Sequence, residues 1–193
     1  GILAGMPVLR RWSGTPELLS PDAGFNPCRE GMHWRWDGVD FFMLNPSVAS
    51  EAGLSNNRSC VLRVANARHT VLLTGDSEQA VERRLTASGL DLHAQVLIVP
   101  HHGSKTSSST GFIQAVNPDL ALFSAGYLNR FKHPNPEVVD RYLREGAQVL
   151  KTSDQGAVRI RSRAGFESLS IETALCERPF AAFLSAVCRQ DRL

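Results

Sequence analysis

The stretch LIVPHHGSKTSSS (Leu97–Ser109) contains the strongest indication of the fold in this sequence. An apolar run that ends in proline has the pattern of a buried strand, and two histidines follow it at once. Polar side chains directly after a buried strand are typical of the sites of α/β proteins, because the sheet holds the backbone while the loop is free to vary. The stretch therefore predicts an α/β fold with a functional site at a strand end.

Strands and helices are expected to alternate along the rest of the chain. Helix 76–89 is predicted to take Ser77 as its N-cap, and helix 135–146 to take Asn135 and to turn Leu143 inward. Residues 1–38 are expected to be mainly loop. A further short helix is expected around 112–116, and strands are expected at 39–46, as a hairpin within 60–75, and at 95–100, 119–126, 157–162 and 167–172. Hairpins at both ends make the predicted sheet mixed.

The composition is that of an ordinary globular chain. Its 193 residues carry a net charge of +2 and are 42% hydrophobic. This charge argues against a strong general attraction to nucleic acid, and no apolar run approaches the roughly 20 residues that span a bilayer. Of the four cysteines, Cys28 and Cys60 would be joined in an oxidising compartment, or all four are buried free thiols.

Three expected strand ends carry groups that bind metals. Asp76 follows VLLTG, His101 and His102 follow VLIVP, and His133 comes shortly after the next strand. A carboxylate with two or three imidazoles at successive strand ends is a ligand set suited to zinc or manganese. The simpler alternatives are Asp76 as a helix cap together with Gln79, the histidine pair as part of a turn, and His133 as an exposed loop residue.

The segments LLTGD, VPHHGS and NRFKHP, in this order, resemble the metallo-β-lactamase superfamily. More narrowly, they resemble the metallo-β-lactamase-like domain at the C-terminal end of the ComEC competence proteins. The resemblance runs from about Trp34 to Gly156 and assigns residues 1–173 to this domain and 174–193 to a C-terminal tail. It implies an αββα sandwich with two metal ions, in a protein whose other parts lie in the inner membrane. This domain is expected on the periplasmic side and to process incoming DNA as a metal-dependent hydrolase.

The resemblance also implies roles for single residues. Asp76 matches the aspartate that bridges the metals, and His101 or His102 matches a terminal ligand, with His102 slightly favoured. These three are the expected catalytic residues. His133 matches a further ligand or a phosphate contact. Ser104 and Lys105 lie where they would touch a phosphate.

One departure from the family pattern limits these expectations. The superfamily signature H-x-H-x-D-H supplies most ligands of the first metal, and no H-x-H occurs in these residues. The chain is therefore expected to be the C-terminal part of the domain only. By itself it is expected to bind no metal and to be inactive, and to form a homodimer through sheet edges that the missing part leaves exposed.

Two other functions fit the same sequence. In VRIRSR, the alternating Arg159, Arg161 and Arg163 would project from one face of a strand and suit a DNA backbone, which favours a non-catalytic DNA-binding or scaffold module. The simpler reading of this strand is a solvated edge with protective charges. The chain would otherwise be another metal-dependent phosphodiesterase or esterase of the superfamily, such as a phosphorylcholine esterase-like enzyme.

Overall fold

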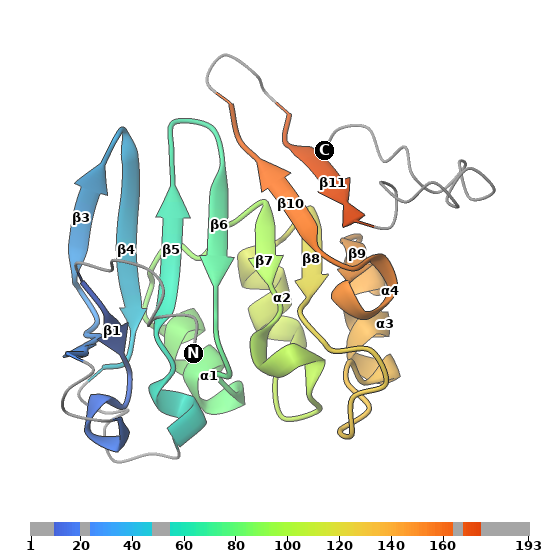
Figure 1. Ribbon diagram of the computed structural model, residues 1–193, viewed down its shortest axis with the longest axis horizontal. Helices are drawn as coiled ribbons and strands as arrows, with labels where there is room; N and C mark the ends of the chain where they lie inside the picture. Colours follow the sequence, from blue (N-terminus) through green and yellow to red (C-terminus); the bar gives the residue numbers. More distant parts are fainter. Residues whose placement is uncertain (1–9, 20–23, 48–54, 164–167, 175–193) are drawn as a thin grey trace.

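A mixed seven-stranded sheet forms the centre of the computed structural model, which describes residues 10–19, 24–47, 55–163 and 168–174 (Figure 1). Its strands lie in chain order: β3 (His33–Trp36), β4 (Val39–Asn45), β5 (Val61–Ala65), β6 (Thr70–Leu73), β7 (Val96–Ile98), β8 (Leu120–Phe123) and β9 (Gln148–Lys151). The strands from β3 to β6 are antiparallel, and those from β6 to β9 are parallel. The predicted α/β class and mixed sheet are confirmed, but the strands expected at 157–162 and 167–172 lie outside this sheet, so the prediction of a hairpin at its C-terminal end is wrong.

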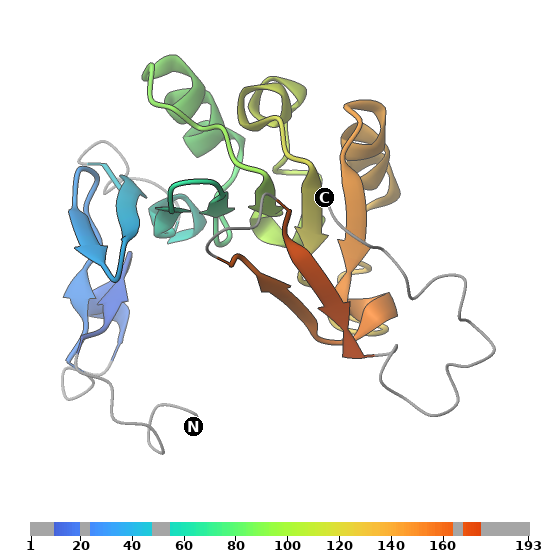
Figure 2. The ribbon, with the colours of Figure 1, turned by 90° about the horizontal axis from the view of Figure 1, so that it is seen from above.

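Three helices cover one face of this sheet (Figure 2). They are α1 (Gln79–Ala87), α2 (Thr110–Val116) and α3 (Pro136–Arg144). Between the helices and the sheet lies a continuous core that includes Leu72, Leu85, Leu97, Ile113 and Tyr142. Burial of this apolar surface against the strands accounts for the position of the helices, because each helix is amphipathic and too short to persist alone.

A hairpin of β10 (Val158–Arg161) and β11 (Ser170–Thr173) covers the opposite face (Figure 2). A second apolar cluster joins the two, with Val96, Leu122 and Leu150 from the sheet against Ile160 and Ile171 of the hairpin. The short helix α4 (Thr152–Gln155) leads into it. Helices, a first sheet and a second smaller sheet therefore stack in the order expected of an αββα sandwich.

The N-terminal region contains more structure than its composition predicts. The prediction that residues 1–38 are mainly loop misses β3, and also the short strands β1 (Trp12–Ser13) and β2 (Asn26–Pro27). Trp34 of β3 stacks on Phe41 of β4 with ring centroids 5.0 Å apart, and this contact favours the pairing. Cys28 forms a disulfide with Cys60, so the first of the two cysteine alternatives holds for this pair.

The helix ends differ in part from the expected ones. Asn135 caps α3 by accepting a hydrogen bond from the Glu137 N–H, as predicted. Ser77 does not cap α1: Glu78 occupies the N-cap position without a side-chain cap, and the Gln79 N–H donates to the Thr106 carbonyl instead. Leu143 is 54% exposed, so its predicted inward position is wrong.

Among the residues that the structure describes, no helix is both long enough and apolar enough to cross a membrane. Strands β3 and β9 are the edges of the seven-stranded sheet. Dimerisation through such an edge stays a prediction, and most of the proposed tail, 175–193, lies outside the described residues.

Candidate functional site

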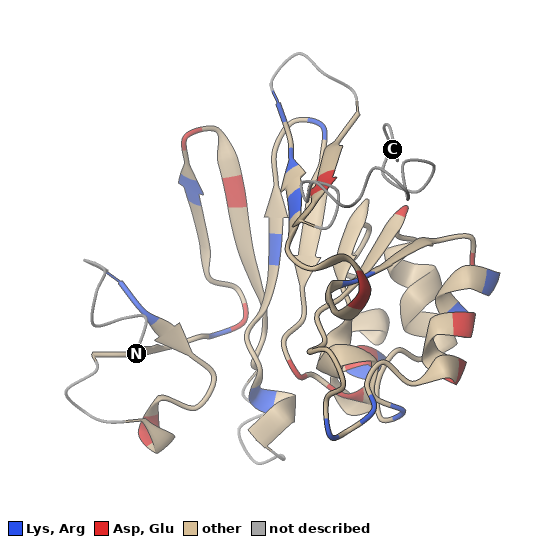
Figure 3. Ribbon diagram, turned by 45° about the vertical axis from the view of Figure 1, so that its right-hand side comes forward, with Lys and Arg blue, Asp and Glu red and all other residues tan. Residues whose placement is uncertain are grey.

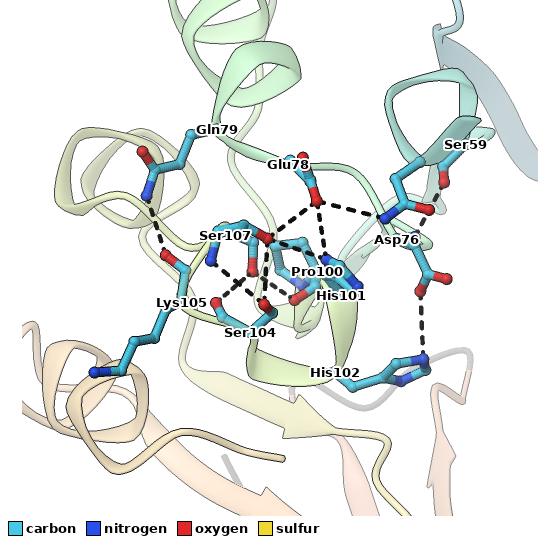
Figure 4. Close-up of polar contacts among 12 residues, drawn as sticks. Ser59, Asp76, Glu78, Gln79, Pro100, His101, His102, Ser104, Lys105 and Ser107 are labelled. Carbon is cyan, nitrogen blue, oxygen red and sulfur yellow. Dashed lines mark hydrogen bonds and ion pairs between the residues drawn. The ribbon is translucent and has the colours of Figure 1, made fainter. Parts of the chain in front are cut away.

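The candidate site lies where the parallel strands β6, β7 and β8 end. Three loops leave the sheet at this edge, and they carry Asp76, the His101–His102 pair and His133. Because the carboxyl ends of parallel strands meet at the same edge, residues far apart in the sequence become neighbours there. Figure 4 shows Asp76, Glu78 and both histidines of the pair facing one another across these loops.

A tight turn after β7 presents the two histidines. His101 and His102 have φ values of 49° and 56°, and Gly103 continues the left-handed path with a φ of 81°. The His101 N–H donates to the Gly75 carbonyl over 2.9 Å, which ties the turn to the end of β6. Left-handed conformations are costly for residues other than glycine, and such residues cluster at functional sites. The turn makes the two adjacent imidazoles face different partners.

His102 faces Asp76. Its Nε2 lies 3.3 Å from the Asp76 Oδ1, and its Nδ1 lies 2.6 Å from the Ser124 carbonyl oxygen. A carbonyl only accepts, so Nδ1 carries a proton, and the neutral ring presents its Nε2 lone pair to the carboxylate. Two acceptors attract each other only through a proton or a cation between them. This arrangement of a backbone-oriented imidazole beside a carboxylate is common among metal ligands.

His101 faces a carboxylate that the sequence argument missed. Its Nδ1 lies 3.4 Å from Glu78 Oε1 and 3.2 Å from the Thr106 hydroxyl, which itself donates to Glu78. Asn56 also donates to the Glu78 side chain. The only signal for Glu78 in the sequence is its place two residues after Asp76, where the pattern indicates the start of a helix. The site thus contains two carboxylate–imidazole pairs.

The remaining predicted residues lie around these pairs. The ring of His133 is 6.1 Å from that of His101, and burial, followed by the nearby imidazoles of His101 and His102, lowers the pKa of His133. Ser104 is buried and shares a hydrogen bond with the Thr106 hydroxyl. Lys105 is exposed and pairs with Glu137 over 3.0 Å.

A buried glutamate holds the loop that follows the histidine turn. Glu82 of α1 accepts hydrogen bonds from the N–H groups of Ser108 and Ser109, and Arg141 of α3 donates to the carbonyls of Ser107 and Ser108. Burial raises the pKa of Glu82 although these hydrogen bonds oppose the shift. Residues 107–109, which follow the histidine turn, are therefore hydrogen-bonded to both α1 and α3.

Comparison with known proteins identifies the family. The chain is 41% identical to competence protein ComA of Neisseria gonorrhoeae over 77% of its own length and 21% of that protein. It is 40% identical to recombination protein 2 of Haemophilus influenzae, over 69% of this chain and 16% of that protein, and 34% identical to ComE operon protein 3 of Bacillus subtilis, over 69% and 17%. The chain is a ComEC-like competence protein domain. No family model matches it.

The ComEC-like domain spans about a fifth of the length of the competence protein ComA, the first of these relatives. Its described residues do not by themselves complete a metal site, because no group of three or more histidine, cysteine, aspartate or glutamate side chains converges among them closely enough to hold an ion. Asp76 and His102 offer two donors of suitable chemistry, whereas structural and catalytic zinc sites use at least three protein ligands.

The arginines of β10 do not form a free basic stripe in the ComEC-like domain. Arg159 and Arg161 share a face as predicted, but both pair with Glu172 of β11, at 3.2 Å and 2.6 Å. Arg163 is exposed and lies beyond the end of the strand, so the prediction that all three project from one strand is wrong. A DNA backbone would have to displace Glu172 to reach the first two.

Proposed function

We propose that this ComEC-like domain acts in the uptake of transforming DNA, within a protein whose remainder lies in the inner membrane. Its strand-end site would contribute Asp76 and His102 to a divalent metal centre, of zinc or manganese, for the hydrolysis of phosphodiester bonds. The observation that carries this proposal is the Asp76–His102 pair, in which the Ser124 carbonyl fixes the imidazole tautomer that leaves Nε2 available.

The pair supplies two donors, so we propose that the other ligands come from outside the described residues. By itself the chain would then neither hold a tightly bound ion nor cleave DNA. Lys105 is placed to exchange Glu137 for a phosphate group, since both partners are exposed and an exposed ion pair contributes little. The Cys28–Cys60 disulfide supports an oxidising, extracytoplasmic location, because such bonds persist outside the reducing cytosol.

The test uses the complete gene in the competent cell that carries it. A strain lacking the gene would be complemented with Asp76→Asn or His102→Ala, and transformation frequency measured with expression checked by immunoblot. We expect transformation frequency to fall at least about 100-fold. Removing a hydrogen-bond partner of a metal ligand typically costs 10–100-fold in metal affinity or activity, and removing the ligand itself should cost no less. The matched controls are Asp119→Asn and His93→Ala, both at exposed positions shortly before β8 and β7, at the opposite ends of these strands from the candidate site. Wild-type transformation by both site variants would refute the proposal.

The incompleteness of the site is tested on the purified chain. Elemental analysis is expected to find less than stoichiometric zinc or manganese, and a labelled DNA substrate is expected to stay intact with either metal added. Near-stoichiometric metal, together with DNA cleavage that Asp76→Ala abolishes, would show that this chain alone contains the whole site.

A further inference from the structure

The loop between β8 and α3, residues 126–134, exposes an unusual amount of apolar surface. Tyr127 is 78% exposed, Leu128 84% and Phe131 63%, and all three lie within five positions. Single exposed apolar residues are ordinary, but a cluster on one loop marks an interaction site. The loop leaves the same sheet edge as the candidate site, below the sheet in Figure 1.

Hydrogen bonds within this loop fix the path of its backbone. The Asn129 side chain donates to the carbonyls of Gly126 and His133, and it accepts from the His133 N–H. Lys132 adds a backbone bond to the Asn129 carbonyl. The loop backbone is therefore ordered while the rings of Tyr127 and Phe131 stay exposed, which lowers the entropic cost of binding a ligand on them.

A column of flat side chains runs from the loop to the strand ends. The Arg130 guanidinium lies 4.5 Å from the centroid of the Phe131 ring, and Phe131 stacks on His133 with centroids 5.8 Å apart and an 18° angle between planes. His133 in turn meets His101 of the HHG turn edge-on at 6.1 Å. A ligand lying on this column would reach the Asp76–His102 pair.

The charges beside the rings suit a polyanion. Arg130 and Lys132 are exposed, and within the described residues neither forms an ion pair. The loop lines an open groove of about 730 Å³, which Asp140 and the Lys151–Asp154 pair also line. Figure 3 shows Lys and Arg positions on the loops along this lower edge of the molecule. The positive charge that is free to bind phosphate therefore lies on the loop.

We propose that loop 126–134 binds single-stranded DNA, with bases stacked on Tyr127 and on the face of Phe131 that Arg130 covers in the free chain, and with phosphates held by Arg130 and Lys132. The identity of the polymer rests on the proposed function. Exposed rings beside free cations are the pattern by which proteins hold single strands without reading their sequence. A duplex offers no free base face to such rings, so the strand that reaches the site is single. The loop would guide it along the column to the strand ends.

The experiment measures binding of the 193-residue chain to a fluorescent 20-nucleotide oligothymidylate and to a duplex of equal length by anisotropy. Tyr127→Ala and Phe131→Ala are each expected to weaken single-strand binding about tenfold, and Phe131→Trp to retain it. Leu128→Ala, on the same loop but without a ring, is the matched control and is expected to stay within about twofold. Replacing both Arg130 and Lys132 with Gln should reduce the slope of log affinity against log salt by about 1.4. Circular dichroism checks that each variant is folded.

Four results would overturn the inference. The first three are equal binding of single strand and duplex, a loss with Leu128→Ala as large as with the ring variants, and ring-dependent binding only to vesicles of anionic phospholipid. Normal single-strand binding by Tyr127→Ala and Phe131→Ala would also overturn it while leaving the proposed function intact, because that function is tested by transformation with changes at Asp76 and His102. Conversely, ring-dependent binding of the single strand together with wild-type transformation by the Asp76 and His102 variants would support the inference about the loop and refute the proposed metal site.

Discussion

Replacing Glu82 with alanine tests how the HHGSKTSSS loop is held. The Glu82 side chain is 1% exposed, and its two carboxylate oxygens accept from the N–H groups of Ser108 and Ser109. In Glu82→Ala both donors lose their partner, and no other acceptor of the described residues is bonded to them. A buried donor without a partner is costly, so the loop and the start of α2 should be destabilised together.

The magnitude follows from the two hydrogen bonds. Each bond to a charged acceptor contributes about 1.5–3 kcal/mol, which gives about 3–6 kcal/mol for the pair. Burial of the carboxylate offsets part of this, as the raised pKa of Glu82 indicates. We therefore expect Glu82→Ala to lower the free energy of unfolding by about 3 kcal/mol, or the melting temperature by about 6–12 °C. Glu82→Gln keeps one acceptor and the volume and avoids the buried charge, so it should lose less than about half as much.

The assay is urea unfolding followed by circular dichroism, with Glu145→Ala on exposed surface as the matched control. The pH dependence has a definite sign. Because the folded pKa of Glu82 is raised above about 4.5, its contribution to stability is complete below that pH and is lost as the pH rises through the folded pKa. Glu82→Gln should remove this part of the pH slope. A loss of less than about 1 kcal/mol in Glu82→Ala, or an equal loss in the glutamine variant, would refute the reasoning.

Two further predictions concern the backbone. Gly103→Ala should lower the free energy of unfolding by about 2–5 kcal/mol, because φ is +81° and the new Cβ would lie 2.7 Å from the Phe123 ring. Gly89→Ala, with a φ of +73° and nothing within 4 Å, isolates the cost of the backbone and should lose clearly less in the same urea assay. Replacing Cys28 and Cys60 with serine should cost about 3–4 kcal/mol, since the bond closes a loop between positions 32 apart. Thiol titration of the denatured protein should count two fewer thiols before reduction than after it, and equal counts would exclude the bond.

Much of the architecture is readable from the sequence because it follows from local patterns. Apolar runs ending in polar loops predicted β6, β7 and β8, and Asn135 followed by Pro136 predicted the start of α3. The patterns failed where long-range contacts decide. Strand β3 forms because Trp34 packs on Phe41 of the neighbouring strand, and its own four residues carry too little signal to predict this.

The order of strands and polar loops in the sequence is enough to predict that Asp76 and the histidine pair come to one sheet edge, because successive parallel strands end on the same side. Which imidazole meets Asp76 depends on the folded loops. The left-handed turn at His101 and His102 sends one ring toward Glu78 and the other toward Asp76 and the Ser124 carbonyl. Neither the turn nor its hydrogen-bond partners produce a periodic pattern that could be recognised in the sequence. Their positions depend on hydrogen bonds between loops that lie about 20 or more residues apart, and such bonds exist only once the sheet has assembled.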